Sequence, residues 1–259
     1  MTESASITLL TDFGLNDPYV GVMKGVLWRE CPTAKVIDLT HAIEPFDRVA
    51  AAFWIERVFG WFAKETVHLV VIDPGVGTAR RALALRAHGH FFVAPDNGIL
   101  SGVHASDASA EAREIDVAAL GLMLPSRTFH GRDIFAPVAA RLASGRLAFD
   151  TVGPIVDALS ERVLPSATLV GSSIVGQIVT RDRFGNLLTN IAAPASARYE
   201  ARVREQRLRV LDTYADADVA EIFGIFGSFG VLELALREGH AASVLPWSQG
   251  TPVELRPVS

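Results

Sequence analysis

The alternation of strand-like and helix-like segments over the first 145 residues constrains the fold most strongly. Three short apolar runs read as strands: SITLLT (6–11), KVIDL (35–39) and VHLVVID (67–73). Helix-like segments stand between them, from Tyr19 to Cys31 and over FDRVAAAFWIERVFGWF (46–62). Parallel strands need long crossover connections, which are usually helices. The order therefore predicts an α/β region with a mostly parallel sheet flanked by helices.

The helix ends can be predicted from capping residues. Asp17 precedes Pro18, so we expect Asp17 to be the N-cap and Pro18 the first helical residue. A further helix is expected from Arg132 to Ser144. The buried face of the first helix is expected to contain Val22, Val26 and Trp28.

The pattern changes after Gly153-Pro154. From Ser172 onward the segments are short and separated by turns: SIVGQIVT, NLLTNI, ARVREQRLRVL, FGIFGSFGVLELA and TPVELRPV. Such spacing is typical of a compact, mostly β domain. We therefore expect an N-terminal α/β domain over residues 1–165 and a smaller C-terminal β domain over residues 166–259.

Composition narrows the class of protein. The chain has 259 residues, 49% of them hydrophobic, which is enough for one large core or two smaller ones. The net charge of −5 is dispersed, which argues against a nucleic-acid partner. A single cysteine, Cys31, fits a reducing compartment. The N-terminus does not resemble a signal peptide and no apolar run is long enough to span a membrane, so we expect a soluble cytoplasmic protein.

The stretch VVIDPGVGTARRALAL (70–85) resembles a phosphate-binding loop, but it matches neither of the two established phosphate-loop patterns. A Walker loop needs a Lys-Ser/Thr pair after its last glycine, and a dinucleotide loop needs a third glycine and an immediate helix. Here Arg80 follows instead, and ALALRAHGHFFVAP resembles two strands around Gly89. The loop is therefore expected to join two strands and to place Asp73 at a carboxyl strand end, where α/β sheets bind ligands.

Four other motifs share this form of a strand end followed by polar residues and glycine. Each could be an ordinary turn, and the kinase-like triplet in TDFG lacks the other kinase motifs. A metal site at Asp12, Asp73, Asp96 and His130 is not favoured, because no His or Cys pair has ligand spacing. The motifs are TDFG (11–14), PDNG (95–98), FHGRDIFAP (129–137) and RDRFGNLLTN (181–190).

In this order, with DPGVGTARR, these motifs resemble the S-adenosyl-L-methionine hydroxide adenosyltransferase family, the adenosine-forming hydrolases of S-adenosyl-L-methionine (SAM). Fluorinases and chlorinases are halide-using relatives. The resemblance covers nearly the whole chain. It implies an α/β N-terminal domain, a small C-terminal β-barrel, and a homotrimer with active sites between neighbouring subunits.

The resemblance also indicates whether the chain is a hydrolase or a halogenase. The hydrolases share an Asp–Arg–His set around the attacking water, which matches Asp73, Arg80 and His130 here. Fluorinase has Tyr in place of Asp73 and Ser in place of Gly131, and it lacks the histidine. The chain is therefore expected to use water.

Substrate contacts follow from the same resemblance. Asp12 is expected to bind the ribose hydroxyls, Asp182 the methionine ammonium, Asn186 the adenine edge and Ser228 the methionine carboxylate. Phe229 replaces a second polar residue common in the family, so backbone amides are expected to help hold the carboxylate.

The chemistry requires water to attack the ribose C5′ in line and expel neutral methionine from a sulfonium. An arginine beside Asp73 weakens that carboxylate as a base, because the cation stabilises its charged form. Two routes stay open: Arg80 and His130 lower the pKa of a bound water, or Asp73 orients the water and accepts its proton late. Neither route needs a metal or redox cofactor. The alternatives are a non-catalytic protein that binds SAM or adenosine, and a SAM-dependent halogenase.

Overall fold

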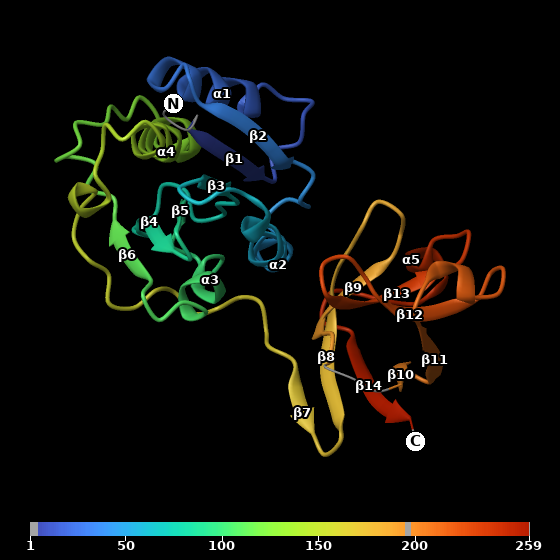
Figure 1. Cartoon of the computed structure of the whole chain (residues 1–259). Helices are drawn as coiled ribbons and strands as arrows, with labels where there is room; N and C mark the ends of the chain where they lie inside the picture. Colours follow the sequence, from blue (N-terminus) through green and yellow to red (C-terminus); the bar gives the residue numbers. More distant parts are fainter. Residues whose placement is uncertain (1–4, 195–197, 259) are drawn as a thin grey trace. The chain divides into compact units, whose positions relative to one another are not determined.

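A computed structural model describes residues 5–194 and 198–258 (Figure 1). The chain divides between Leu164 and Pro165 into two compact units. No helix in the described part is long and apolar enough to cross a membrane.

The N-terminal unit is built on a six-stranded sheet in the order β2-β1-β3-β5-β4-β6. Only β4 runs against the others, because it pairs antiparallel with both β5 and β6. The prediction of a mostly parallel sheet is confirmed. The strands are β1 (Ser6–Thr11), β2 (Lys35–Thr40), β3 (Val67–Val71), β4 (Ala82–Ala87), β5 (His90–Pro95) and β6 (Glu111–Glu114).

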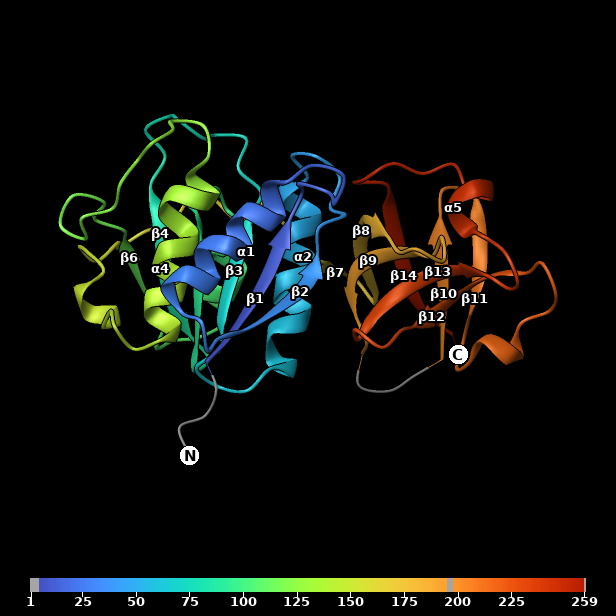
Figure 2. The ribbon, with the colours of Figure 1, turned by 90° about the horizontal axis from the view of Figure 1, so that it is seen from above.

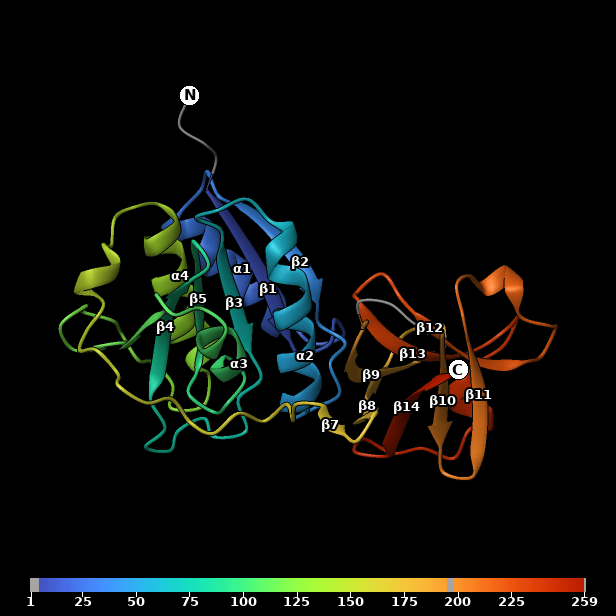
Figure 3. The same cartoon turned by 60° about the horizontal axis from the view of Figure 1, so that its bottom comes forward.

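Helices cover both faces of this sheet. Figure 2 shows α1 (Tyr19–Glu30) and α4 (Ala136–Ala143) in front of the strands, and Figure 3 brings α2 (Arg48–Val58) and α3 (Ser101–Ala105) forward. Side chains of α1 and α4 share one core with alternate residues of β1 and β3. Short turns of 3-10 helix lie at Phe59–Trp61 and Phe149–Thr151.

The first helix corrects two sequence predictions. Its N-cap is Pro18 and no side chain caps it, so the role predicted for Asp17 is wrong. Val26 is buried as expected, but Val22 and Trp28 are 40% and 70% exposed. The buried residues are Val20, Met23, Val26 and Leu27. Their three- and four-residue spacing follows the helical period, which places Val22 and Trp28 outside the buried stripe.

Two other helices are shorter than expected. Phe46 has a φ of 70°, outside the helical region, so α2 begins only at Arg48, with Asp47 accepting a hydrogen bond from the Ala50 amide. The predicted helix 132–144 begins instead as a π-helical turn, Gly131–Phe135, and becomes α-helical at Ala136. Pro137 stands in the first turn of α4, where its missing N–H costs little.

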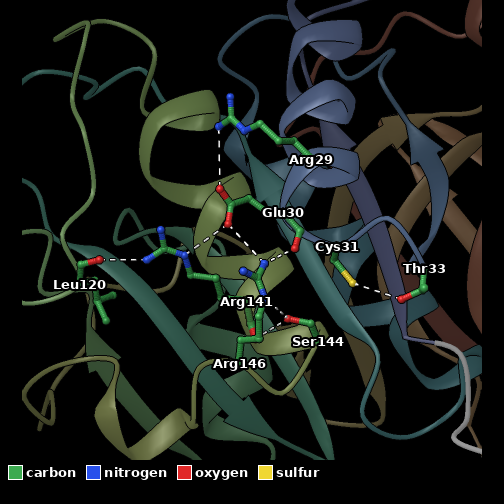
Figure 4. A network of polar contacts seen from close by, with 8 residues as sticks. All are labelled: Arg29, Glu30, Cys31, Thr33, Leu120, Arg141, Ser144 and Arg146. Atoms are coloured by element: carbon green, nitrogen blue, oxygen red, sulfur yellow. Dashed lines mark hydrogen bonds and ion pairs between the residues drawn. The ribbon is translucent and has the colours of Figure 1, made fainter.

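Glu30 joins the end of α1 to α4 and the segment after it (Figure 4). Its carboxylate lies 3.6 Å from Arg141 Nε and 3.3 Å from Arg146 Nη2, and Arg146 also donates to the Glu30 carbonyl. Arg141 donates in addition to the Leu120 carbonyl at 2.9 Å. Cations at the C-terminal end of a helix also interact favourably with its dipole. The two helices on this face are thus fixed to each other.

The C-terminal unit is a closed seven-stranded β-barrel, as the resemblance implied. Closure comes from β8, which pairs with β9 and also with β14, and β7 adds to β8 as a hairpin. Closing a sheet removes its unpaired edges. The remaining elements are β7 (Thr168–Val170), β8 (Ser173–Arg181), β9 (Leu187–Ala192), β10 (Arg198–Val203), β11 (Gln206–Leu211), a 3-10 turn (Tyr214–Asp216), β12 (Ile222–Phe226), β13 (Val231–Leu236), α5 (Ala241–Val244) and β14 (Pro252–Val258).

Candidate active site

Three of the predicted motifs meet at the same edge of the N-terminal sheet. The strands β1, β3 and β5 are parallel neighbours, and each is followed within two residues by an aspartate. The aspartates are Asp12, Asp73 and Asp96. Ligands bind at the carboxyl edge of α/β sheets, so this edge is the candidate site in this unit.

Asp73, Arg80 and His130 form one contact group. Arg80 Nε donates to Asp73 Oδ1 at 2.8 Å, and Arg80 Nη2 donates to Asp73 Oδ2. The same Nη2 lies 2.8 Å from His130 Nδ1. The side chains of Asp73 and Arg80 are only 6% and 10% exposed, so their ion pair is shielded from water. The structure thus brings together the three residues that the resemblance singled out.

The contact with Arg80 fixes the hydrogen position on His130. A guanidinium can only donate, so Nδ1 of His130 must accept and the ring hydrogen must sit on Nε2. Burial, and then the positive charge of Arg80, lower the pKa of His130. The ring is therefore neutral near pH 7 and offers an N–H from Nε2.

The loop after β3 folds so that Arg80 returns to Asp73. The amide of Val76 donates to the Asp73 carbonyl and that of Thr78 to the Gly75 carbonyl, which makes two successive turns. Gly77 has a φ of 79°, a conformation that glycine adopts without strain. The loop leads directly into β4, as predicted, and the Arg80 guanidinium lies 5.2 Å from the centre of the Phe135 ring.

Asp12 lies within electrostatic reach of this group. Its Oδ2 accepts a hydrogen bond from the Phe46 amide at 2.9 Å. Burial raises the pKa of Asp12, and the negative charge of Asp73 raises it further. Nearby, Thr11 is hydrogen bonded to the buried His41 at 2.8 Å. One oxygen of Asp12 is thus committed to the Phe46 backbone, while the other accepts no hydrogen bond from a different residue of the described chain.

Asp96, by contrast, has a structural role. Its carboxylate accepts from Arg81 Nε at 2.8 Å and from the Ser160 amide at 2.8 Å. These bonds attach the segment near Ser160 to the end of β5. Across residues 5–194 and 198–258, no three potential metal ligands cluster.

An aromatic group adjoins the motifs on this edge. The rings of Phe13, Tyr19 and Phe129 are in mutual contact, with centroid separations of 5.3 to 5.9 Å. Phe13 follows Asp12 and Phe129 precedes His130 in the sequence. This group could not be found from sequence, since its members come from three separate segments.

In the barrel, Asp182 and Asn186 are hydrogen bonded to each other. The Asn186 amide donates to Asp182 Oδ1 at 2.8 Å, and Asn186 Nδ2 donates to Asp182 Oδ2 at 3.0 Å. Asn186 Nδ2 also donates to the Tyr214 hydroxyl at 3.1 Å. The Tyr214 hydroxyl in turn donates to Glu233 Oε2 at 3.4 Å. Tyr214 and Glu233 were missed from sequence: Glu233 lies in the quoted segment FGIFGSFGVLELA, but nothing in the sequence pairs it with Tyr214 or Asn186.

The barrel group is acidic, and its members range from the buried Asn186 and Glu233 to Tyr214, which is 46% exposed. Glu233 is buried, and burial followed by the charge of Asp182 raises its pKa. Burial and the charges of Glu233 and Asp182 raise the pKa of Tyr214 to about 12. Ser228 lies in an exposed turn between β12 and β13 and makes no hydrogen bond to the described residues.

Comparison with known proteins agrees with the geometry. Residues 7–153 match the SAM hydroxide adenosyltransferase N-terminal domain, and residues 176–254 match the C-terminal domain. The chain belongs to the SAM hydroxide adenosyltransferase family. The family assignment made from the motifs is confirmed.

Individual relatives are similar over most of their length. An (R)-S-adenosyl-L-methionine hydrolase from Thermus thermophilus is 39% identical, over 96% of this chain and 98% of the relative. A fluorinase from Actinoplanes is 28% identical over 71% of each chain. The crystal structure of an uncharacterized conserved protein from Thermotoga maritima superposes with a TM-score of 0.88 at 37% identity, covering 96% of this chain and 99% of that one.

Proposed function

We propose that this protein hydrolyses SAM to adenosine and L-methionine by in-line attack of water at the ribose C5′. The observation that carries the proposal is the contact group of Asp73, Arg80 and His130 at the carboxyl edge of the sheet. The relatives named (R)-S-adenosyl-L-methionine hydrolase support the same substrate and reaction.

The proposed roles of Asp73, Arg80 and His130 follow from which of their hydrogen atoms already take part in hydrogen bonds within the protein. Both Nη2 hydrogens of Arg80 are taken by Asp73 and His130, and Nη1 donates to the Arg81 carbonyl. The Nε2 hydrogen of His130 is the donor that this ring offers to the water oxygen. Asp73 has no hydrogen to give, so it is the group that accepts the proton of the water. This favours the route in which Asp73 orients water and takes its proton late.

The apolar surroundings assist this step. In the transition state positive charge passes from the sulfonium to the oxygen of the attacking water, and the carboxylate of Asp73 stabilises that charge until it accepts the proton. Exclusion of bulk water strengthens this attraction. The rings of Phe13 and Phe129, which contact each other, are proposed to supply apolar surface to the site.

The substrate contacts are proposed from the family resemblance and from the free acceptors. Asp12 would hold the ribose hydroxyls. Asp182 would hold the methionine ammonium, Asn186 the adenine edge and Ser228 the carboxylate. The first residue lies in the N-terminal unit and the other three in the barrel, with the domain boundary placed near residue 165. We propose that a homotrimer completes each site from neighbouring subunits, which light scattering of the purified protein tests.

One assay tests the reaction. The purified chain is incubated with SAM, and the products are separated by chromatography. Adenosine and methionine in equal amounts are expected, with and without a chelator, because the proposed chemistry uses no metal or redox cofactor. Tight binding without turnover would instead support the non-catalytic alternative. We also propose that the protein acts in the cytoplasm.

A further inference from the structure

We propose that Tyr214 and Glu233 are positioning residues that make Asn186 select adenine over hypoxanthine. The inference rests on the proposed function and deepens it, because it concerns which base the barrel accepts. Neither residue was among the candidate site residues predicted from the sequence.

Asn186 uses both hydrogens of its side chain within the protein. The amide nitrogen donates one toward Asp182 at 3.0 Å and one toward Tyr214 at 3.1 Å. The atom facing the carboxylate must be the nitrogen, since a carboxylate only accepts. Asn186 is 6% exposed, and its Oδ1 accepts from no donor among the described residues. The carbonyl oxygen is therefore the group left for a ligand.

The hydroxyl of Tyr214 has a single hydrogen, which faces Glu233 Oε2 at 3.4 Å. The Tyr214 oxygen is left to accept from Asn186. Glu233 thus acts through Tyr214: by taking the hydroxyl hydrogen it prevents the hydroxyl from donating to the Asn186 carbonyl. The Asn186 side chain is held in one orientation from both sides.

Glu233 is itself held by close packing. Its carboxylate lies against Gly227, where an added Cβ would come within 1.8 Å of Glu233 Oε1. Glu233 belongs to β13, and it is 6% exposed. A buried carboxylate has an energetic cost unless it is hydrogen bonded, and its bond here is to Tyr214. The contacts of Tyr214 and Glu233 therefore leave Asn186 Oδ1 as a hydrogen-bond acceptor for a ligand.

A hydrogen-bond acceptor at Asn186 Oδ1, with no donor beside it, distinguishes adenine from hypoxanthine. Adenine carries an exocyclic amine, which donates to Asn186 Oδ1. Hypoxanthine carries a carbonyl at the same position, and two acceptors facing each other repel. A site built around a hydrogen bond rejects an analogue that cannot form it more strongly than shape alone would.

Titration calorimetry with adenosine and inosine measures this selection on the full-length chain. We expect the unmodified protein to bind adenosine more tightly by about tenfold or more. Tyr214→Phe removes one of the two contacts that hold the Asn186 amide in this orientation, so the ratio should fall to about threefold or less. Tyr199→Phe makes the same chemical change on β10 of the same barrel and should leave the ratio unchanged.

The Tyr214→Phe change leaves Glu233 buried without its donor and lowers stability. The double variant Tyr214→Phe/Glu233→Leu removes both polar groups and serves as the test if the single variant does not fold. A folded variant that keeps the full preference for adenosine overturns the inference, as does an unmodified protein without any preference. An unmodified protein that forms no adenosine from SAM overturns the proposed function instead.

Discussion

Nη2 of Arg80 lies 2.8 Å from Nδ1 of His130 while also donating to Asp73. One nitrogen therefore orients both the group that would accept a proton and the ring that would donate a hydrogen bond. Because the three side chains share these bonds, a change at one of them alters the other two.

Replacing Arg80 or His130 should lower kcat more than it changes KM. Arg80→Lys keeps the charge but loses the two-point contact with Asp73, and His130→Ala removes the Nε2 donor. We expect each to reduce kcat by about a hundredfold, with the double variant falling short of the product of the two effects. Steady-state kinetics of the three variants make the comparison.

Arg81→Lys is the matched control for that experiment. Arg81 is the next residue, and it binds Asp96 rather than Asp73. It should change thermal stability while leaving kcat within about twofold. Multiplicative effects of Arg80→Lys and His130→Ala would show that the two side chains act independently.

Asp12→Asn should weaken substrate binding. The asparagine can still accept from the Phe46 amide, so the loop should keep its fold, but the charge offered to the ribose hydroxyls is lost. Charge-assisted hydrogen bonds contribute about 1.5 to 3 kcal/mol, so KM should rise about tenfold to a hundredfold with a smaller change in kcat. Asp17→Asn, in the exposed part of the same loop, is the control. An unchanged KM in the Asp12 variant would exclude the ribose role.

Much of this organisation could be predicted from sequence because it is local. The strand at 67–73 and the loop after it are contiguous, so one short motif, DPGVGTARR, holds both Asp73 and Arg80, and the family resemblance carried by that motif associated them. Tyr214 and Glu233 could not be found in this way, since their meeting with Asn186 depends on strand register in a closed barrel. The error at Val22 and Trp28 has a similar cause: the direction of a helix face is set by the sheet that it covers.

The buried histidines His68 and His90 should make the protein acid-sensitive. His68 Nδ1 is hydrogen bonded to Thr8 at 2.7 Å, and its Nε2 lies 3.3 Å from His90 Nδ1. Burial, and then the charge of His90, lower the pKa of His68 to about 3, and burial and Lys64 lower the pKa of His90 to about 4. Both rings are thus neutral in the folded protein at mildly acidic pH.

The sign of the effect follows from proton uptake. In the unfolded chain these histidines titrate near pH 6.5. Between pH 6.5 and about 4 the unfolded state binds protons that the folded state does not, so the free energy of unfolding falls as pH falls. Urea unfolding at pH 7, 6 and 5 measures this slope. His68→Gln should make it shallower, whereas His240→Gln, at an exposed histidine, should leave it as it is.

The origin of the oxygen in the product gives the most direct test of the nucleophile. If Asp73 and His130 hold a water in line with C5′, reaction in ¹⁸O-labelled water must place the label on the 5′-oxygen of adenosine. Chloride or fluoride at high concentration should give little 5′-halo-adenosine, because the buried carboxylate of Asp73 repels an anion at that position. Mass spectrometry of the nucleoside product detects both the ¹⁸O label and any 5′-halo-adenosine in one sample. Asp73→Asn removes the repulsion and the proton acceptor together, so it should suppress hydrolysis and weaken the discrimination against halide. Unlabelled adenosine, or halide product predominating in the unmodified protein, would contradict attack by water and favour a reaction of the halogenase type.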